Sequence, residues 1–449
     1  MGEEKKVGRE EDRFSLEPIP LDKRKPWTYH AVVWAGVCFV LAALMGGATP
    51  LTLLPFKQAL VALVVGNLIL FTIFSFTSYM GAKTGLSTYM LAERAFGRYG
   101  ARILINFVAS GIPSFAWYGF ETWLAAAAIG VLAGWDIGGP DHLMDWRTAA
   151  FTMITGIIMA IPPMMGLTSV ALIDFVSIPI MVALTGYGLY LGYKLGAAGA
   201  LLSYNPGIPP EMMAKNMMIA IHIVVGLIIV GATIASDTAR WIKPEKRNVL
   251  LAGFLGFFSV ALFMEIVGSF YAVAAVKAGL SPDLAWNIVL VLKQLGATTS
   301  FLWIFLILAF ILQFTTNMLN AYSGGLALTA TFGKSTWRPW LTLAGAVFGS
   351  VIAVLGVIWK WIPYLSMLAN WVAPVAAVLL SEFYIVKRGF TESGVTKVRW
   401  EALISWLIGG FVSYYLSVHK PFIVPSIMGM AVAAALHVAL RIAVTKTQK

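Results

Sequence analysis

The chain has 449 residues, of which 59% are hydrophobic and 12% are charged, and its mean hydropathy is +0.81. In a soluble domain about a quarter of the residues are charged, so this composition excludes a soluble globular protein. The sequence therefore predicts a protein that lies almost entirely within a lipid bilayer.

Apolar stretches follow one another along the whole chain, and each is long enough to cross a bilayer, which takes about 20 residues. We expect spans at 29–53, 58–80, 103–133, 148–167, 168–193, 216–236, 249–276, 301–331, 341–359, 361–386, 401–417 and 421–443. The pattern predicts an all-α integral membrane protein with about twelve transmembrane helices.

The net charge of +11 is distributed unevenly between the segments that join these spans. With the N-terminus inside, 24 of the 32 Lys and Arg residues fall on the inner side. Basic residues concentrate on the cytoplasmic side of membrane proteins, so we expect a multi-pass protein of the plasma membrane with both termini cytoplasmic. The positive charge is then a topology signal, which favours contact with lipid and argues against a nucleic acid partner.

The remaining segments carry no signal of a second activity. Residues 1–27 are polar, mix both charges and lack the apolar core of a cleaved signal peptide, so we expect them to form a cytoplasmic tail. The single cysteine, Cys38, excludes an intrachain disulfide and a cysteine metal cluster. The stretch 333–336 (GKST) resembles the end of a phosphate-binding loop, but Leu328 replaces the required glycine. We therefore expect no cofactor, no catalytic residues and no obligatory protein partner.

Glycines in the first and sixth spans suggest discontinuous helices. Gly46, Gly47, Pro50 and an earlier Gly36 lie in the first span, and Gly226 and Gly231 lie in the sixth. Many transporters consist of two inverted repeats with a broken helix in each, so breaks five spans apart would fit this pattern. Close helix packing is the alternative explanation for the glycines, and it stays open here.

Five acidic residues fall within or near the spans, where a charge is costly and usually has a function. Glu382 and Asp237 lie near inner helix ends, so we interpret them as salt-bridged anchors. Asp174 is more simply structural. Glu265 is either a coupling carboxylate or a buried protonated acid. The third span places Ser114, Trp117 and Glu121 on one helix face, where the indole could stack against a planar ring.

The eighth span is unusually polar. It contains Gln313, Thr315, Thr316, Asn317 and Asn320. Hydroxyl and amide oxygens suit a hard cation such as Na⁺, whereas the simpler explanation is hydrogen bonding between helices.

Several motifs together resemble one transporter family. The strongest match is Gly66 and Asn67 followed by 79–88 (YMGAKTGLST) and 95–97 (AFG), with support from 117–119 (WYG), 237–241 (DTARW) and 315–317 (TTN). In this order and spacing they resemble the nucleobase–cation symporter family, which also includes hydantoin, allantoin and purine carriers. The similarity runs from about residue 28 to residue 443.

The resemblance implies a LeuT-type fold with two inverted repeats at 28–200 and 201–386, followed by two extra helices within 387–449. It implies a Na⁺ site formed by the backbone at Gly36, Val40 and Leu312 and by the hydroxyls of Thr315 and Thr316. It also implies a substrate site at Trp117 with Asn317. The sequence departs from the family pattern at two places. Ser114 stands where cytosine permease-like members have an amide side chain. The sixth-span region that helps to sandwich the substrate's ring in the family falls on Leu227 and Ile228, which are not aromatic.

These residues leave three functions to be distinguished. The first is Na⁺-coupled uptake of a small planar nitrogen heterocycle, with Trp117, Ser114, Glu121 and Asn317 in its site. The second keeps the fold but transports an amino acid, amine or vitamin precursor, or uses H⁺ through Glu121 or Glu265. The third, a membrane enzyme, is disfavoured because the five histidines are scattered over separate spans or loops.

Overall fold

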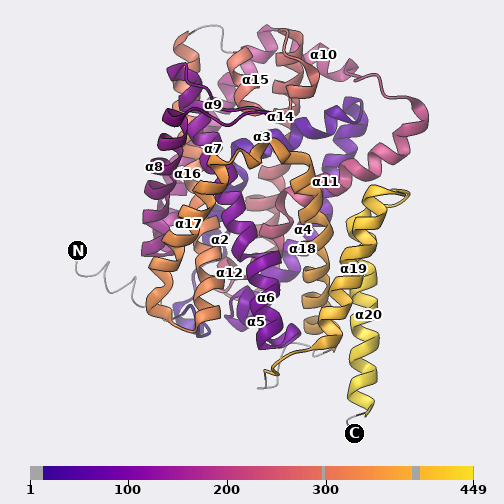
Figure 1. Ribbon diagram of the computed structural model, residues 1–449. Helices are drawn as coiled ribbons and strands as arrows, with labels where there is room; N and C mark the ends of the chain where they lie inside the picture. The colour runs from indigo at the N-terminus through magenta and orange to yellow at the C-terminus, as the bar shows by residue number, and fades with distance from the viewer. Residues whose placement is uncertain (1–13, 296–298, 387–394, 448–449) are drawn as a thin grey trace.

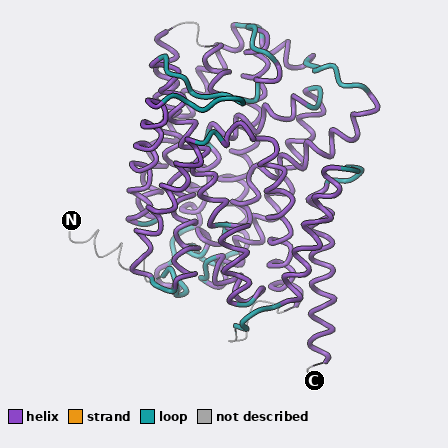
Figure 2. The backbone as a smooth tube through the Cα atoms, in the orientation of Figure 1, coloured by secondary structure: helices purple, strands orange, loops and turns teal. Residues whose placement is uncertain are grey.

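The computed structural model describes residues 14–295, 299–386 and 395–447, and the side chains of part of the fifth span and of the first part of the eighth are also outside the description. The described chain is all-helical, joined by loops and without a strand (Figure 2). The helices run side by side as a bundle, with α5, α6 and α12 at one end and α10 and α15 at the other (Figure 1).

The helices of the first half are α2 Trp27–Cys38, α3 Leu41–Ala48, α4 Phe56–Thr84, α5 Thr88–Phe96, α6 Arg98–Leu104, α7 Gly111–Ala133, α8 Trp146–Met165, α9 Leu167–Lys194 and α10 Ala197–Ser203. Those of the second half are α11 Met213–Ile234, α12 Ser236–Ala239, α13 Lys246–Ala252, α14 Ser259–Lys277, α15 Ile288–Leu295, α16 Thr299–Phe332, α17 Arg338–Val354 and α18 Trp361–Ser381. The last two helices are α19 Trp400–Val418 and α20 Pro425–Thr447. Short π-helical turns at Ile105–Ala109, Gly253–Phe258 and Glu382–Val386 continue or join these helices.

Nine helices or joined helices among the described residues are long and apolar enough to cross a membrane, and α2 with α3 forms a tenth, bent span. Helices α9 and α16 have 28 and 34 residues. At about 1.5 Å per residue both can cross a hydrocarbon core of about 30 Å. With these two long helices, the described residues contain enough helices to form the twelve spans that the sequence predicts.

The first span is broken, but not at its glycines. Helix α2 ends at Cys38, Phe39 and Val40 are non-helical, and α3 runs from Leu41 through Gly46 and Gly47, with an angle of 61° between the two parts. The predicted break in the first span is therefore present, but it lies at Phe39 and Val40, after Gly36 and before Gly46, Gly47 and Pro50. A backbone break leaves the last carbonyls of α2 and the first amides of α3 without helical partners.

The sixth span differs more from expectation. Helix α11 continues through Gly226 and Gly231 to Ile234, so neither glycine breaks it. A Cβ atom at Gly226 would lie 2.1 Å from the carbonyl oxygen of Leu365, which means that this glycine lets α11 and α18 approach each other closely. The packing explanation for these glycines is the correct one.

Residues 14–25 pack against the end of the bundle that contains α5 and α12. Ile19 donates its backbone N–H to the carbonyl of Gly85 at 3.0 Å, and Lys25 donates to Trp241 at 2.6 Å. Phe14 and Ile19 are 5% and 1% exposed. This part of the expected polar tail is thus folded onto the helices and covers their ends.

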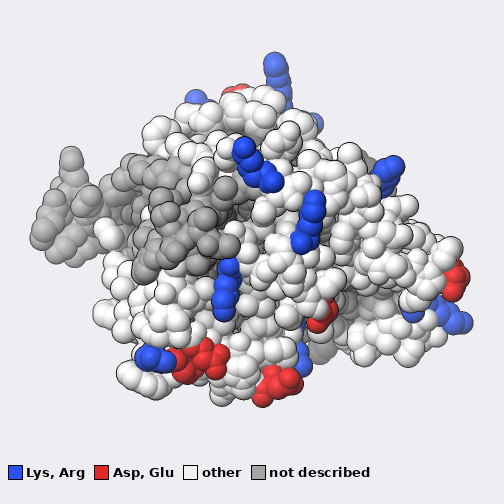
Figure 3. All heavy atoms as spheres, turned by 90° about the horizontal axis from the view of Figure 1, so that it is seen from above, with Lys and Arg blue, Asp and Glu red and all other residues white. Residues whose placement is uncertain are grey.

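At the opposite end, Asp145 begins α8 as its N-cap. The carboxylate accepts a hydrogen bond from the backbone N–H of Thr148 at 2.9 Å, and this bond, together with the Arg147 guanidinium, lowers the pKa of Asp145 to about 2. Seen from above, basic and acidic side chains are scattered singly or in small groups among uncharged residues (Figure 3). On the face seen in Figure 3, the described residues form no continuous basic surface.

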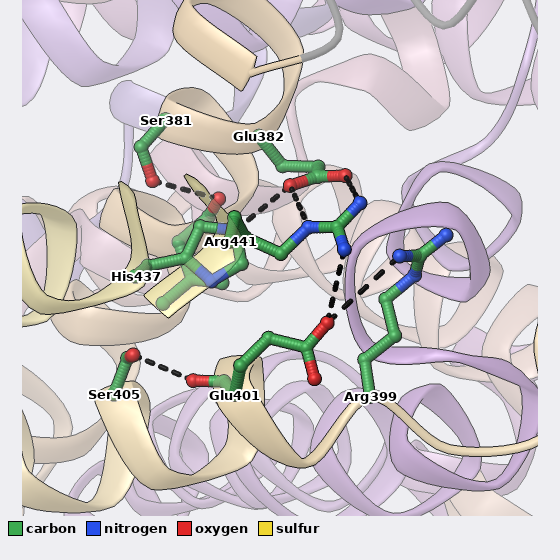
Figure 4. Close-up of polar contacts among 8 residues, drawn as sticks. Ser381, Glu382, Arg399, Glu401, Ser405, His437 and Arg441 are labelled. Carbon is green, nitrogen blue, oxygen red and sulfur yellow. Dashed lines mark hydrogen bonds and ion pairs between the residues drawn. The ribbon is translucent and has the colours of Figure 1, made fainter. Parts of the chain in front are cut away.

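The last two helices are joined to the bundle by a buried ion-pair cluster (Figure 4). Arg441 of α20 donates to Glu382 through Nε at 3.2 Å and Nη2 at 3.3 Å, and through Nη1 to Glu401 at 3.1 Å. His437 lies 2.9 Å from the Glu382 carboxylate. Glu382 is therefore salt-bridged, as expected, but its described partners come from α20, and the neighbouring Lys387 and Arg388 lie outside the described residues. The cluster ties α18, α19 and α20 together.

Candidate functional site

The break in the first span brings backbone oxygens towards the eighth span. The carbonyl of Gly36 lies 3.5 Å from the Thr315 hydroxyl and 3.4 Å from that of Thr316, and the carbonyl of Val37 lies 3.3 Å from Thr316 Oγ1. Hydroxyl–carbonyl hydrogen bonds are usually about 2.7–2.8 Å, so these contacts are long. The end of a helix also carries a partial negative charge. These oxygens form a group with the chemistry that a monovalent cation requires.

Two other residues predicted for this group are less clearly placed. Val40 lies in the non-helical link and borders the adjacent cavity, but its carbonyl accepts a hydrogen bond from Ala43 at 3.2 Å. Leu312 lies in α16 at a position outside the described side chains, and the same holds for Asp174 in α9.

A cavity opens beside this oxygen group. It contains about 590 Å³ of empty space, including its opening, and is bordered by α2, α3, α7, α11 and α16. Of the residues predicted for the substrate site, Trp117, Glu121, Leu227 and Ile228 line it, and so does Thr316 of the oxygen group. Residues from the third, sixth and eighth spans are thus brought together at the break in the first.

Trp117 is fixed in the cavity wall by other aromatic rings. Its indole meets Trp361 edge to face at a centroid distance of 5.7 Å and Tyr364 at 5.6 Å. Phe120 stacks on Tyr364 at 4.6 Å and supports this arrangement. Trp117 is 6% exposed. Edge-to-face contacts hold a ring in one orientation, so the indole is a rigid part of the wall.

Glu121 connects the cavity to the break in the first span. Its carboxylate accepts a hydrogen bond from the side-chain amide of Gln313, and the Gln313 carbonyl oxygen accepts from the backbone N–H of Leu41 at 3.1 Å. Leu41 is the first residue of α3, where an N–H lacks a helical acceptor. A single side chain, Gln313, thus links Glu121 to the break in the first span beside the oxygen group.

Ser114 and Asn317, which the sequence predicted to lie in the substrate site, are not among the residues that line the cavity. Asn317 donates to the carbonyl of Tyr118 at 3.1 Å and to the hydroxyl of Thr122 at 2.9 Å, so its amide joins α16 to α7. Ser114 is fully buried, and its hydroxyl has no hydrogen-bond partner in the described part of the chain.

Asn320 is the eighth-span amide that faces the cavity. Successive residues of an α-helix are rotated by about 100°, so Asn317 points away from the face that Thr316 occupies, whereas Asn320, four residues after Thr316, returns to it. That i to i+4 spacing was present in the sequence and could have identified Asn320. Trp34 of α2 also lines the cavity and was missed, because no sequence signal distinguishes it from a core residue.

Comparison with known proteins places these features in context. Residues 18–434 match the model of the family described as permease for cytosine/purines, uracil, thiamine, allantoin. The cytosine permease of Escherichia coli (strain K12) is 26% identical over 419 residues, which cover 93% of this chain and 91% of that protein. The hydantoin permease of Microbacterium maritypicum is 23% identical over 93% of this chain and 86% of its own.

Two solved structures resemble the fold over nearly the full length. Mhp1, a nucleobase-cation-symport-1 family transporter in a closed conformation with bromovinylhydantoin bound, superposes with a TM-score of 0.76 at 21% identity and covers 96% of both chains. A Na⁺-coupled sialic acid symporter superposes with a TM-score of 0.61 at 11% identity over 98% of this chain and 95% of its own. The similarity confirms the predicted all-α, LeuT-type membrane fold.

Proposed function

The chain belongs to the nucleobase–cation symporter family of permeases for cytosine and purines, uracil, thiamine and allantoin, and from this premise we propose that it takes up a small planar nitrogen heterocycle together with Na⁺. The family makes the protein a secondary transporter rather than an enzyme. Its substrate, its coupling ion, its plasma-membrane location and its cytoplasmic termini are parts of the proposal.

The observation that carries the proposal is the position of the cavity. It lies where the ends of α2 and α3 meet the Thr315 and Thr316 hydroxyls, and Trp117 stands in its wall. A cation at the α2 carbonyls and a ring against the indole would both hold the first span in one arrangement. Two ligands that favour the same conformation promote each other's binding, which is the thermodynamic basis of symport.

Glu121 limits which substrates the cavity can bind. It is the ionisable acid in the cavity wall, and no basic side chain is found among the described lining residues. A carboxylate accepts hydrogen bonds and attracts positive charge, so the wall disfavours an anionic substrate. We therefore propose a ring with N–H donors, such as cytosine, as the first choice. A cationic amine or vitamin precursor is the second candidate, because the same carboxylate would pair with its charge.

A thermal-shift screen of the purified protein tests the function as a whole. Cytosine, uracil, allantoin, a hydantoin, thiamine and simple amines would each be added in Na⁺ and in K⁺. A ligand at a hundred times its Kd stabilises the folded state by about 2.7 kcal/mol, which a shift in the unfolding midpoint reveals. Stabilisation by a nitrogen heterocycle in Na⁺ but not in K⁺ is expected, and no response to any ring would refute the proposal.

Replacing Thr316 with alanine should weaken the response to Na⁺. The variant loses one hydroxyl of the oxygen group, and a hydrogen-bonding contact with a charged partner is worth about 1.5 kcal/mol at the lower end, or about tenfold in apparent Na⁺ affinity. Uptake into proteoliposomes as a function of Na⁺ concentration measures it. Thr329→Ala is the matched control, because this α16 hydroxyl donates within its own helix to Gly325 at 2.7 Å. Unchanged sodium dependence in Thr316→Ala would remove Thr316 from the site.

Replacing Glu121 with glutamine separates the two substrate classes. Glutamine keeps the size and the acceptor oxygen but removes the charge, so a cationic ligand should lose about tenfold more affinity than a neutral ring does. Competition binding with a neutral and a cationic ligand from the screen gives the two affinities. Glu93→Gln, on α5 outside the membrane-spanning helices, is the control. Equal losses for both ligands would show that the charge of Glu121 does not select the substrate.

A further inference from the structure

A second buried acid lies outside the substrate cavity and pairs with an amide. Glu265 of α14 and Asn67 of α4 are both fully buried. The Asn67 amide nitrogen donates to Glu265 Oε2 and to the backbone carbonyl of Leu63, the latter at 2.9 Å. Within the described residues, the other two oxygens of the pair, Glu265 Oε1 and Asn67 Oδ1, have no hydrogen-bond partner. Two acceptors thus face a buried environment with no donor between them.

The surroundings supply no positive charge. Helix α3, which packs on α14, contains no ionisable residue, and a Cβ at Gly47 would lie 1.7 Å from the Glu265 carbonyl oxygen, so the two backbones are in direct contact. The hydroxyl of Ser269 is committed to the Gly47 carbonyl at 2.7 Å. The basic residues of α4 and α14 lie near the helix ends: Lys57, Lys83 and Lys277.

Helix α2, which also packs against α14, ends at the buried thiol of Cys38, a group that carries no positive charge. The same helix carries His30, which is bonded to Ser78 and Thr238, and α15 carries the exposed Lys293. The charged residues of α9 are Asp174, whose side chain lies outside the description, and Lys194 in the last turn. None of the described groups neutralises a Glu265 carboxylate.

An unpaired carboxylate in the membrane interior is unfavourable by several kcal/mol, whereas a protonated carboxyl provides a donor for one of the two unpartnered acceptors. A hard metal cation fits less well, because it is usually bound by about six oxygens and only two acceptors here are uncommitted. We propose that Glu265, paired with Asn67, is a proton-binding site that exchanges its proton during the transport cycle. Helix α3, whose Gly47 is in direct contact with the Glu265 backbone, begins at the break in the first span, so this site is joined to the break by one short helix.

This inference goes beyond the proposed function, since it adds H⁺ as a second ion at a separate site. Glu265→Gln is the informative variant because its amide mimics the protonated acid: it can donate to Asn67 Oδ1 and accept from the Asn67 amide, but it cannot titrate. Glu121→Gln, which alters the acid of the substrate cavity, is the matched control.

Infrared difference spectroscopy of the purified full-length protein in lipid nanodiscs tests the proposal directly. A protonated carboxyl has its own carbonyl band. In the wild type we expect a band that Glu265→Gln lacks, Glu121→Gln retains and a rise in pH removes reversibly. The proposal fails if that band is absent at neutral pH, because Glu265 is then ionised, or if it persists at every pH at which the protein stays folded, because the proton is then fixed.

Two further measurements test the proton site. If Glu265→Gln does not fold, Asn67→Leu should shift the same band to higher frequency, because the hydrogen bonds between the carboxyl and the amide are lost. Titration with NaCl alone, followed by intrinsic tryptophan fluorescence, should give a Na⁺ affinity that varies with pH in the wild type and less in Glu265→Gln. Absence of any Na⁺ response would count against Na⁺ coupling, while the infrared titration would still decide the proton site.

Discussion

Replacing Trp117 with alanine is expected to lower the affinity for the transported ring by about ten- to hundredfold. Stacking of a base on an aromatic side chain is worth roughly 1–3 kcal/mol, and about 1.4 kcal/mol corresponds to a factor of ten. The indole lines the cavity and is held there by Trp361 and Tyr364. Trp34, also in the cavity wall, is held by its own hydrogen bond from Nε1 to the Thr238 hydroxyl at 2.9 Å. Equilibrium binding of the heterocycle identified by the thermal-shift screen provides the measurement.

The phenylalanine variant refines this prediction. Trp117→Phe keeps a smaller aromatic face and should retain part of the affinity. Trp123→Phe is the matched control, because Trp123 is a fully buried tryptophan of the same helix that packs on Trp359 and does not line the cavity. An unchanged affinity in Trp117→Ala, with the protein correctly folded, would mean that the ring binds elsewhere.

Replacing Glu382 with glutamine is expected to have the largest effect on stability. The carboxylate is fully buried and pairs with both Arg441 and His437, so its removal leaves a buried guanidinium partly uncompensated. Breaking a buried ion pair in this way destabilises a protein by about 3–5 kcal/mol. Because the cluster joins α18 to α20, the loss should appear as a lower unfolding midpoint in detergent and as earlier proteolysis of the C-terminal helices (Figure 4).

Glu401→Gln supplies the comparison. Glu401 contacts the same Arg441 at 3.1 Å, but its side chain is 15% exposed, so water can replace part of the lost interaction. The unfolding midpoint of Glu401→Gln should therefore fall less than that of Glu382→Gln. Equal midpoints for the wild type and Glu382→Gln would show that the cluster contributes little to holding α20 against the bundle.

The eighth span shows how far a sequence can lead towards the site. Its unusual polarity identified the helix, and the hydroxyls of Thr315 and Thr316 indeed lie close to the carbonyl of Gly36. The choice between Asn317 and Asn320 depended on how α16 is rotated about its axis. The i to i+4 spacing places Asn320 on the same face as Thr316, but which face of α16 meets the cavity is set by packing against α7 and α8.

Composition, hydropathy and charge distribution determined by themselves that this is a helical membrane protein, because the bilayer imposes the same length and polarity on every span. Helical periodicity determined that Trp117 and Glu121 share one face. The tertiary structure decided the rest. The first span breaks at Phe39 and Val40, where Gln313 from a distant helix accepts the hydrogen bond of Leu41, while the glycines expected to break it serve close packing. Likewise, Glu265 finds its partner Asn67 across 198 positions of sequence. Such contacts arise from the mutual packing of helices, so they become visible only when the chain is folded.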